Sequence, residues 1–97
     1  MRASLTNSDP AQLALRALVW TLAEPDRAMR LLDVTGLTPA DLRARAGEPS
    51  VLSATLAFLL AHEPDLIACA EGLDVPPQAF AEAHAALDGP NTSGDFA

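Results

Sequence analysis

The chain has 97 residues, of which 49% are hydrophobic, and most of these are Ala and Leu. This length fits one domain, and the scarcity of β-branched and aromatic residues favours helices over strands. The net charge is −7, and the part from residue 46 onward has eight acidic residues and no Lys or Arg. Non-specific binding of nucleic acid or anionic membranes through that part is therefore not expected.

Targeting and redox signals are absent from the sequence. A single cysteine, Cys69, excludes a disulfide within the chain, so nothing points to an oxidising compartment. The first ten residues, MRASLTNSDP, lack the apolar core of a signal peptide. The most apolar run, residues 51–61, is shorter than the roughly 20 residues that a membrane span needs. We expect a cytoplasmic protein with no membrane contact.

Proline and glycine divide the chain at regular intervals. Pro is favoured at the first position of a helix because that N–H has no partner, and Gly just past the end takes the left-handed conformation cheaply. These signals predict six helices, at about residues 10–23, 25–34, 38–46, 49–61, 64–71 and 76–87. The expected stops are Gly36, Gly47, Gly72 and Gly89.

Polar residues beside the prolines are expected to cap these helices. Asp9 precedes the first helix, and Thr38 with Asp41 has the spacing of a capping box at the third. Glu63 precedes Pro64 and is expected to cap the fifth helix, while Asp65 favours its dipole.

The predicted fold is an all-α, compact orthogonal bundle of about six short helices. We place it at residues 9–89 as a single helical domain, with a flexible N-terminus at 1–8 and a disordered tail at 90–97. The helix at 49–61 leaves little polar face and is expected to be buried on nearly all sides. The helix at 10–23 has two apolar stripes, so it is expected to pack against more than one neighbour. Its first stripe is Leu15, Leu18, Val19 and Leu22.

The two halves of the chain echo each other. WTLAEPD at 20–26 resembles FLLAHEPD at 58–65, with one extra residue in the second copy, and a Gly-Leu pair follows each. One interpretation is two three-helix repeats with their long first helices packed at the centre. The other is that unrelated helix corners converge on the same cap chemistry.

Four segments in a fixed order carry a family resemblance: TGLTPADLR at 35–43, VL at 51–52, LAFLL at 56–60 and HEPDL at 62–66. In order and spacing they resemble the family known as domain of unknown function 3572, small uncharacterised helical proteins found mainly in alphaproteobacteria. The resemblance covers about residues 10–88. It implies a compact bacterial helical protein with no assigned activity, and it carries over no functional residues.

Histidine and cysteine chemistry has weak support in the sequence. His62 and His84 could join a carboxylate in a metal site, but the zinc-protease pattern requires a second His four residues after the first, and Leu66 stands there. Cys69 has no second cysteine in a Cys-x-x-Cys pattern, so we expect a core cysteine. We predict no catalytic residues, no metal and no cofactor, with a metal-dependent enzyme as the weakest alternative.

The arginines form the most interesting pattern. Four of them flank the Gly36-Leu37 turn, and residues 25–46 have the spacing of a helix-turn-helix. Local helical pairs are expected to occupy them, namely Asp26 with Arg30, Arg30 with Asp33, and Asp41 with Arg45. The residues we select for partner binding are Arg27, Arg30, Arg43, Arg45 and Trp20.

The function expected from these patterns is that of a small non-catalytic interaction or adaptor protein. Its partner is an unknown protein or a second copy of the chain, and Trp20, Leu13 and Phe80 are the apolar side chains expected to remain exposed. The alternative is a DNA-binding regulator that uses residues 25–46, although the acidic net charge disfavours nucleic acid.

Overall fold

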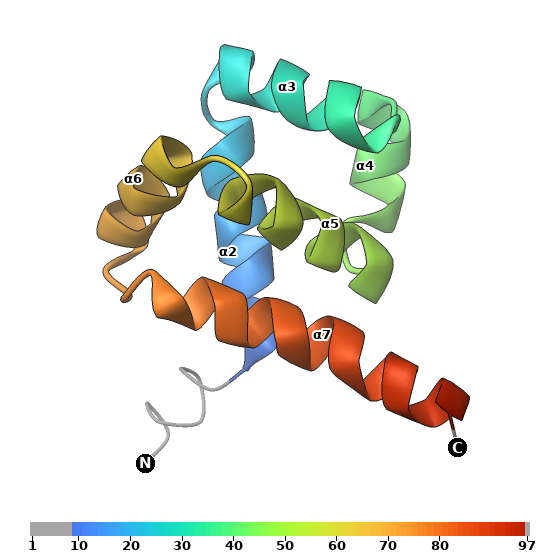
Figure 1. Ribbon diagram of the computed structural model, residues 1–97. Helices are drawn as coiled ribbons and strands as arrows, with labels where there is room; N and C mark the ends of the chain where they lie inside the picture. Colours follow the sequence, from blue (N-terminus) through green and yellow to red (C-terminus); the bar gives the residue numbers. More distant parts are fainter. Residues whose placement is uncertain (1–8, 97) are drawn as a thin grey trace.

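The computed structural model describes the backbone of residues 9–96 and the side chains of residues 9–87. Within this part the chain forms six helices and no strand, so the predicted all-α bundle is confirmed (Figure 1). The helices are α2 (Pro10–Leu22), α3 (Pro25–Thr35), α4 (Pro39–Arg45), α5 (Pro49–Leu60), α6 (Glu63–Leu73) and α7 (Gln78–Phe96). The predicted flexible segment 1–8 lies outside the described residues.

The helix starts follow the predicted cap chemistry at two of three places. The Asp9 carboxylate accepts hydrogen bonds from the N–H groups of Ala11 and Gln12, and Thr38 and Asp41 form a complete capping box. The third prediction is wrong, because His62 is the N-cap of α6 and Glu63 is already its first helical residue. The one extra residue in this corner displaces Glu63 from the capping position.

The helix ends differ more from the prediction. Gly36 has a φ of 75° and ends α3 as expected, but Gly72 lies inside α6. Asp74, with a φ of 60°, takes the left-handed position instead, a conformation that Asp tolerates better than most side chains. The backbone of α7 is helical to Phe96, well past Leu87, where we expected the last helix to end. The predicted domain limits, with a disordered tail at 90–97, stay predictions.

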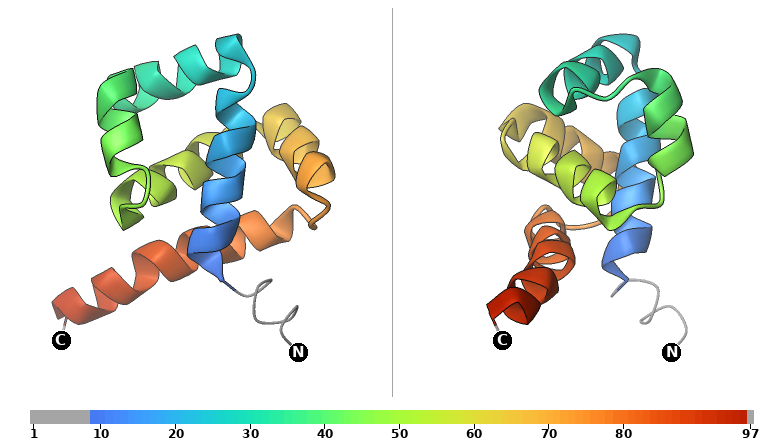
Figure 2. Two further views of the ribbon diagram at one scale, coloured as in Figure 1. Left: turned by 180° about the vertical axis from the view of Figure 1, so that it is seen from behind. Right: turned by 90° about the vertical axis from the view of Figure 1, so that its right-hand side faces the viewer.

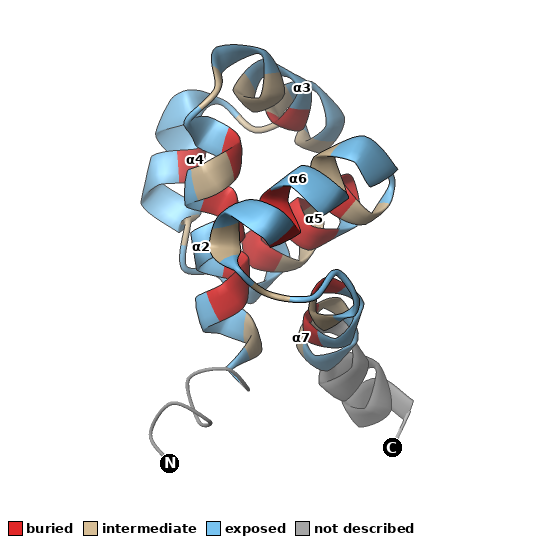
Figure 3. Cartoon of the chain, turned by 90° about the vertical axis from the view of Figure 1, so that its left-hand side faces the viewer, coloured by how far each residue is buried: buried red, intermediate tan, exposed pale blue. Residues whose placement is uncertain are grey.

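The centre of the molecule is the packing of α2, α5 and α7 on one another, with α2 crossing the other two steeply (Figure 2). Val51, Leu52, Leu56 and Leu59 of α5 are almost fully buried, so α5 is central as predicted. The expectation that it is buried on nearly all sides is wrong, because Ser50 and Ala57 are exposed on one face. The inner faces of the helices are buried, whereas α3 and α4 turn mostly exposed surface outward (Figure 3).

The first two helices of each half have similar neighbours, and whether this reflects a repeat or converging corners stays open. Both α3 and α6 pack across α2 and α5, the two long helices at the centre. The third helices differ, because α7 packs against α2 and α5 whereas α4 makes no comparable contact with either. Therefore α4, anchored through the buried Leu42, stands at the edge of the molecule beside an open space between α3 and α5.

No single described helix is long and apolar enough to cross a membrane. Only α5 and α6 together reach that length and composition, and they meet at a bend of 114°.

Candidate functional site

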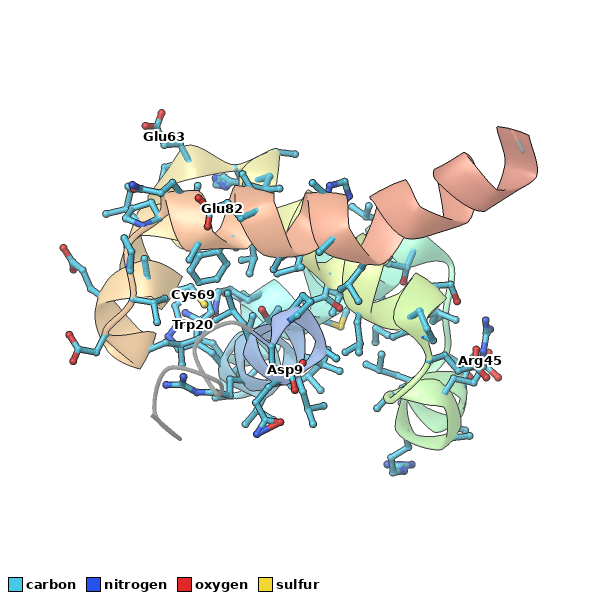
Figure 4. The ribbon with its side chains drawn as sticks, turned by 90° about the horizontal axis from the view of Figure 1, so that it is seen from below. Asp9, Trp20, Arg45, Glu63, Cys69 and Glu82 are labelled. Atoms are coloured by element: carbon cyan, nitrogen blue, oxygen red, sulfur yellow. The ribbon has the colours of Figure 1, made fainter. Side chains whose placement is uncertain are left out.

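The residues selected from the sequence fall into two separate groups. Trp20 and Cys69 lie near each other on one side of the molecule, and Arg45 lies on the opposite side (Figure 4). Arg27 lies over the ring of Trp20, whereas Arg30 and Arg45 line the same groove. The structure therefore does not bring the five predicted residues into one site.

Trp20 and Arg27 form a stacked pair. The guanidinium carbon of Arg27 lies 3.6 Å from the centre of the indole ring, and Nη2 donates a hydrogen bond of 2.9 Å to the Trp20 carbonyl oxygen. Stacking of this kind contributes about 0.5–2 kcal/mol, depending on how far the cation is desolvated. Both side chains therefore stabilise the junction of α2 and α3. Their role in partner binding stays a prediction.

Arg30 makes a tertiary ion pair in place of the two helical pairs that we predicted. Its Nη1 lies 3.0 Å from Oδ2 of Asp65, whose side chain is only 14% exposed. Pairs within one helix stabilise by only a few tenths of a kcal/mol, so a less solvated carboxylate on α6 is the better partner. His62 Nδ1 lies 3.5 Å from the same oxygen, and the Phe58 ring centre is 5.9 Å from the guanidinium carbon.

Arg45 also has a different partner from the predicted one. Its Nε donates a hydrogen bond of 2.9 Å to Glu48, while the predicted partner, Asp41, is engaged in the capping box with Thr38. Both side chains of the Arg45–Glu48 pair are about half exposed, so it contributes little to stability. Arg43 is exposed on the last turn of α4.

A groove of about 830 Å³ runs between α3 and α5 and ends at the last turn of α4. We call it the α3–α5 groove. Its α5 wall is a row of small residues on one helix face, and its α3 wall includes Val34, which is 69% exposed. Buried Val51 and Phe58 also contribute to its lining. The small residues are Ser50, Ala54, Ala57 and Ala61.

The exposed apolar residues are not those that we predicted. Leu13 and Phe80 are buried, with exposures of 7% and 0%, and Trp20 is half-buried against the core. Leu15, Val19 and Leu22 are exposed instead, because α5 and α7 pack against the other face of α2. Leu18 of the same predicted stripe is buried. The sequence does not distinguish these residues, and only the positions of the neighbouring helices decide which of them are covered.

The histidines and the cysteine are not gathered into a metal site. Among the described residues, no group of three or more His, Cys, Asp or Glu side chains is placed to hold a metal ion. Cys69 is fully buried, and this burial raises its pKa from 9.0 to about 12 although Arg27 and Arg16 oppose the shift. At neutral pH the thiol is therefore protonated, and the core cysteine expected from the sequence is confirmed.

In the part of the chain that the structure describes, five helices pack around the central α5 and define a small all-α protein with a large open groove between α3 and α5. The model of a family described as protein of unknown function (DUF3572) matches residues 7–90, and the chain belongs to this family. The resemblance seen in the sequence is thus confirmed, while the alphaproteobacterial source stays a prediction. Neither the curated proteins nor the solved structures contain a match to the chain.

Proposed function

We propose that this protein is a non-catalytic, cytoplasmic interaction module that holds a helix of a partner protein in the α3–α5 groove. The observation that carries the proposal is the groove itself, an open apolar hollow of about 830 Å³ beside a strongly exposed Val34. Contiguous apolar surface of this kind on a small protein is typical of an interaction site.

The shape of the groove favours a helix as the occupant. Helices pack with their axes about 8–10 Å apart, and small side chains at the contact allow the closer distances. The row from Ser50 to Ala61 follows one face of α5 and is about 17 Å long at 1.5 Å per residue, or three helical turns. An amphipathic partner helix that places apolar residues in such a groove is a common recognition mode.

Site-specific photocrosslinking tests the proposal. A photoreactive amino acid at Ser50, which is exposed on the groove wall, is expected to capture a discrete partner in native cytosol. The same amino acid at Ala81, exposed on α7, is the matched control and is expected to capture none. Ala57→Arg fills the groove and is expected to prevent capture from Ser50. Equal capture from Ser50 and Ala81 would exclude the groove as the site.

DNA binding through α4 is the alternative proposal. It is supported by the exposure of Arg43 and Arg45 on the last turn of a helix that follows α3 after a short turn. The ion pair of Arg45 with Glu48 and the seven-residue length of α4 weaken it. Duplex binding that falls steeply with added salt and is lost in Arg43→Ala would favour DNA over a protein partner.

A further inference from the structure

We propose that the helix held in the α3–α5 groove is basic, with a Lys or Arg beside its apolar stripe that pairs with Asp33. This inference rests on the proposed function and adds the chemistry of the partner. Asp33 borders the groove on α3, next to the exposed Val34. Its carboxylate is the charge that the groove leaves unmatched.

The two arginines at the groove are already neutralised by acidic residues of the chain. Arg30 pairs with Asp65 at 3.0 Å, and Arg45 pairs with Glu48 at 2.9 Å. A partner carboxylate that approached either guanidinium would also meet the negative charge of the acid already paired with it. Asp33, by contrast, has no salt-bridge partner among the described residues, so a cation can pair with it without breaking a contact.

The wider electrostatic field favours the same choice. The net charge of the chain is −7, and α6 and the described side chains of α7 contain acidic residues, while neither these two nor the uncharged α5 contains a Lys or Arg. A field of one sign speeds the approach of an oppositely charged partner and repels one of like charge. A helix rich in Glu and Asp would therefore meet repulsion as it approaches the groove.

The positions of Asp33 and Val34 specify where the basic residue must stand. Because the two are neighbours on α3, a partner side chain that covers Val34 brings the residues flanking it close to Asp33. Lys and Arg suit this place, since their aliphatic stems cover apolar surface while the charged group reaches the carboxylate.

Two synthetic 14-residue helices test the inference. Both carry the same Leu and Ala stripe, and their polar positions are all Lys in one peptide and all Glu in the other. Fluorescence anisotropy of each labelled peptide with the full chain, at a fixed 0.1 M salt, is expected to show at least tenfold tighter binding of the Lys peptide. Tighter binding of the Glu peptide would overturn the inference.

Matched variants show whether the Lys peptide binds through the groove and Asp33. Asp33→Asn is expected to weaken binding about two- to fivefold, the size of one exposed ion pair. Asp26→Asn removes a charge from an exposed site of the same helix outside the groove and is expected to have little effect. Equal effects of the two variants would mean that only net charge matters, and the inference would fail.

A further variant separates failure of the inference from failure of the proposed function. Ala57→Arg is expected to abolish binding of the Lys peptide, with circular dichroism to verify the fold and Ala61→Arg as the substitute if it does not fold. If the Glu peptide binds and Ala57→Arg prevents it, the groove holds a helix and only the basic partner is wrong. If the groove variants change the binding of neither peptide, the basic partner is excluded. It is also excluded if the chain forms a concentration-dependent dimer in which a second copy occupies the groove.

Discussion

The corner between α2 and α3 and the corner between α5 and α6 contain the same Ala, Glu, Pro and Asp residues, but only the second has an inserted His62. In the first corner Glu24 is the N-cap of α3, and its carboxylate accepts a hydrogen bond of 3.2 Å from the Arg27 N–H. In the second, His62 takes the cap position without a side-chain hydrogen bond, and Glu63 enters the helix. One inserted residue therefore removes a cap.

The aspartates of the two corners differ in the same way. Asp26 is exposed in the first turn of α3. The side chain of Asp65 is largely buried, and its Oδ2 lies within ion-pair distance of Arg30 and His62. The first corner is thus stabilised locally, while the second ties α6 to α3 at one end of the groove. The comparison shows that a repeated string can keep a turn and still change which parts of the molecule it connects.

The aromatic residues of the two central helices are covered by the same helix. Arg27 stacks on Trp20 of α2 at 3.6 Å, and Arg30 lies 5.9 Å from Phe58 of α5. Since the two arginines are successive positions on one side of α3, this helix holds both halves together. The shorter distance at Trp20 makes the first contact the stronger of the two.

The largest expected difference between the halves lies at Leu59 and Thr21, which occupy matching positions of the two strings and are both fully buried. Leu59→Ala is expected to lower the free energy of unfolding by about 2–5 kcal/mol, because it leaves a cavity in the centre of the core. Thr21→Ala removes only a small side chain whose hydroxyl bonds its own helix, so a loss of about 1 kcal/mol is expected. Urea denaturation measures both, and equal losses would mean that α2 is as central as α5.

The two Gly-Leu pairs provide the next comparison. A Cβ at Gly72 would lie 3.0 Å from Nε1 of Trp20, whose ring is held on its face by Arg27. Gly72→Ala is expected to cost about 1–2 kcal/mol, since crowding outweighs the gain in helix propensity. Gly36→Ala meets nothing within 4 Å, but its φ of 75° leads to a similar loss of about 1–2 kcal/mol.

Trp20 fluorescence distinguishes the two mechanisms, because this is the only tryptophan in the chain. Gly72→Ala is expected to shift the emission spectrum, and Gly36→Ala is expected to leave it unchanged. A Gly72→Ala variant with a native spectrum and native stability would show that the Trp20 ring moves aside without cost.

These differences show which features of the fold a sequence pattern can predict. The prolines predicted the helix starts well, because Pro at the first turn and a side-chain cap depend only on neighbouring residues. The role of Gly72 was missed because its close neighbour, Trp20, is distant in the sequence. The ion pairs of Arg30 and Arg45 were assigned wrongly because tertiary and turn contacts displaced the helical ones.

The candidate groove was less predictable than the fold. Arg30 and Arg45 were selected from the sequence and do border it, but the small residues of α5 that form its wall were interpreted only as core. No pattern in the sequence distinguishes a small residue that faces a neighbouring helix from one that faces a groove. The position of α4 at the edge of the molecule decides this, and it depends on tertiary packing.

The buried thiol of α6 predicts a dependence of stability on pH. Unfolding exposes Cys69 and returns its pKa from about 12 to 9.0, so above pH 9 the unfolded state loses a proton that the native state keeps. Stability therefore falls as the pH rises, by about 1.4 kcal/mol at pH 10 relative to neutral pH. Denaturation at pH 7 and pH 10 checks this, with Cys69→Ala as the control that removes the cysteine contribution. An equal loss in the control would assign the effect to other groups.

The smallest expected difference returns to the two corners. Glu24→Ala removes the carboxylate that caps α3 and is expected to cost about 0.5–1 kcal/mol. Glu63→Ala removes an exposed charge that makes no capping hydrogen bond, and only its interaction with the helix dipole, about 0.3–0.5 kcal/mol, is lost. Added salt screens the dipole interaction of Glu63 more than the hydrogen bond of Glu24, so the gap between the variants is expected to widen at 1 M NaCl.

Deletion of His62 from the chain that keeps Glu63 provides a second measurement. The deletion gives the second corner the same length as the first and lets residue 63 act as a cap. If Glu63→Ala then costs as much as Glu24→Ala, the inserted residue alone accounts for the difference between the two corners; if it still costs less, the ion pair of Asp65 with Arg30 holds the second corner in its own geometry.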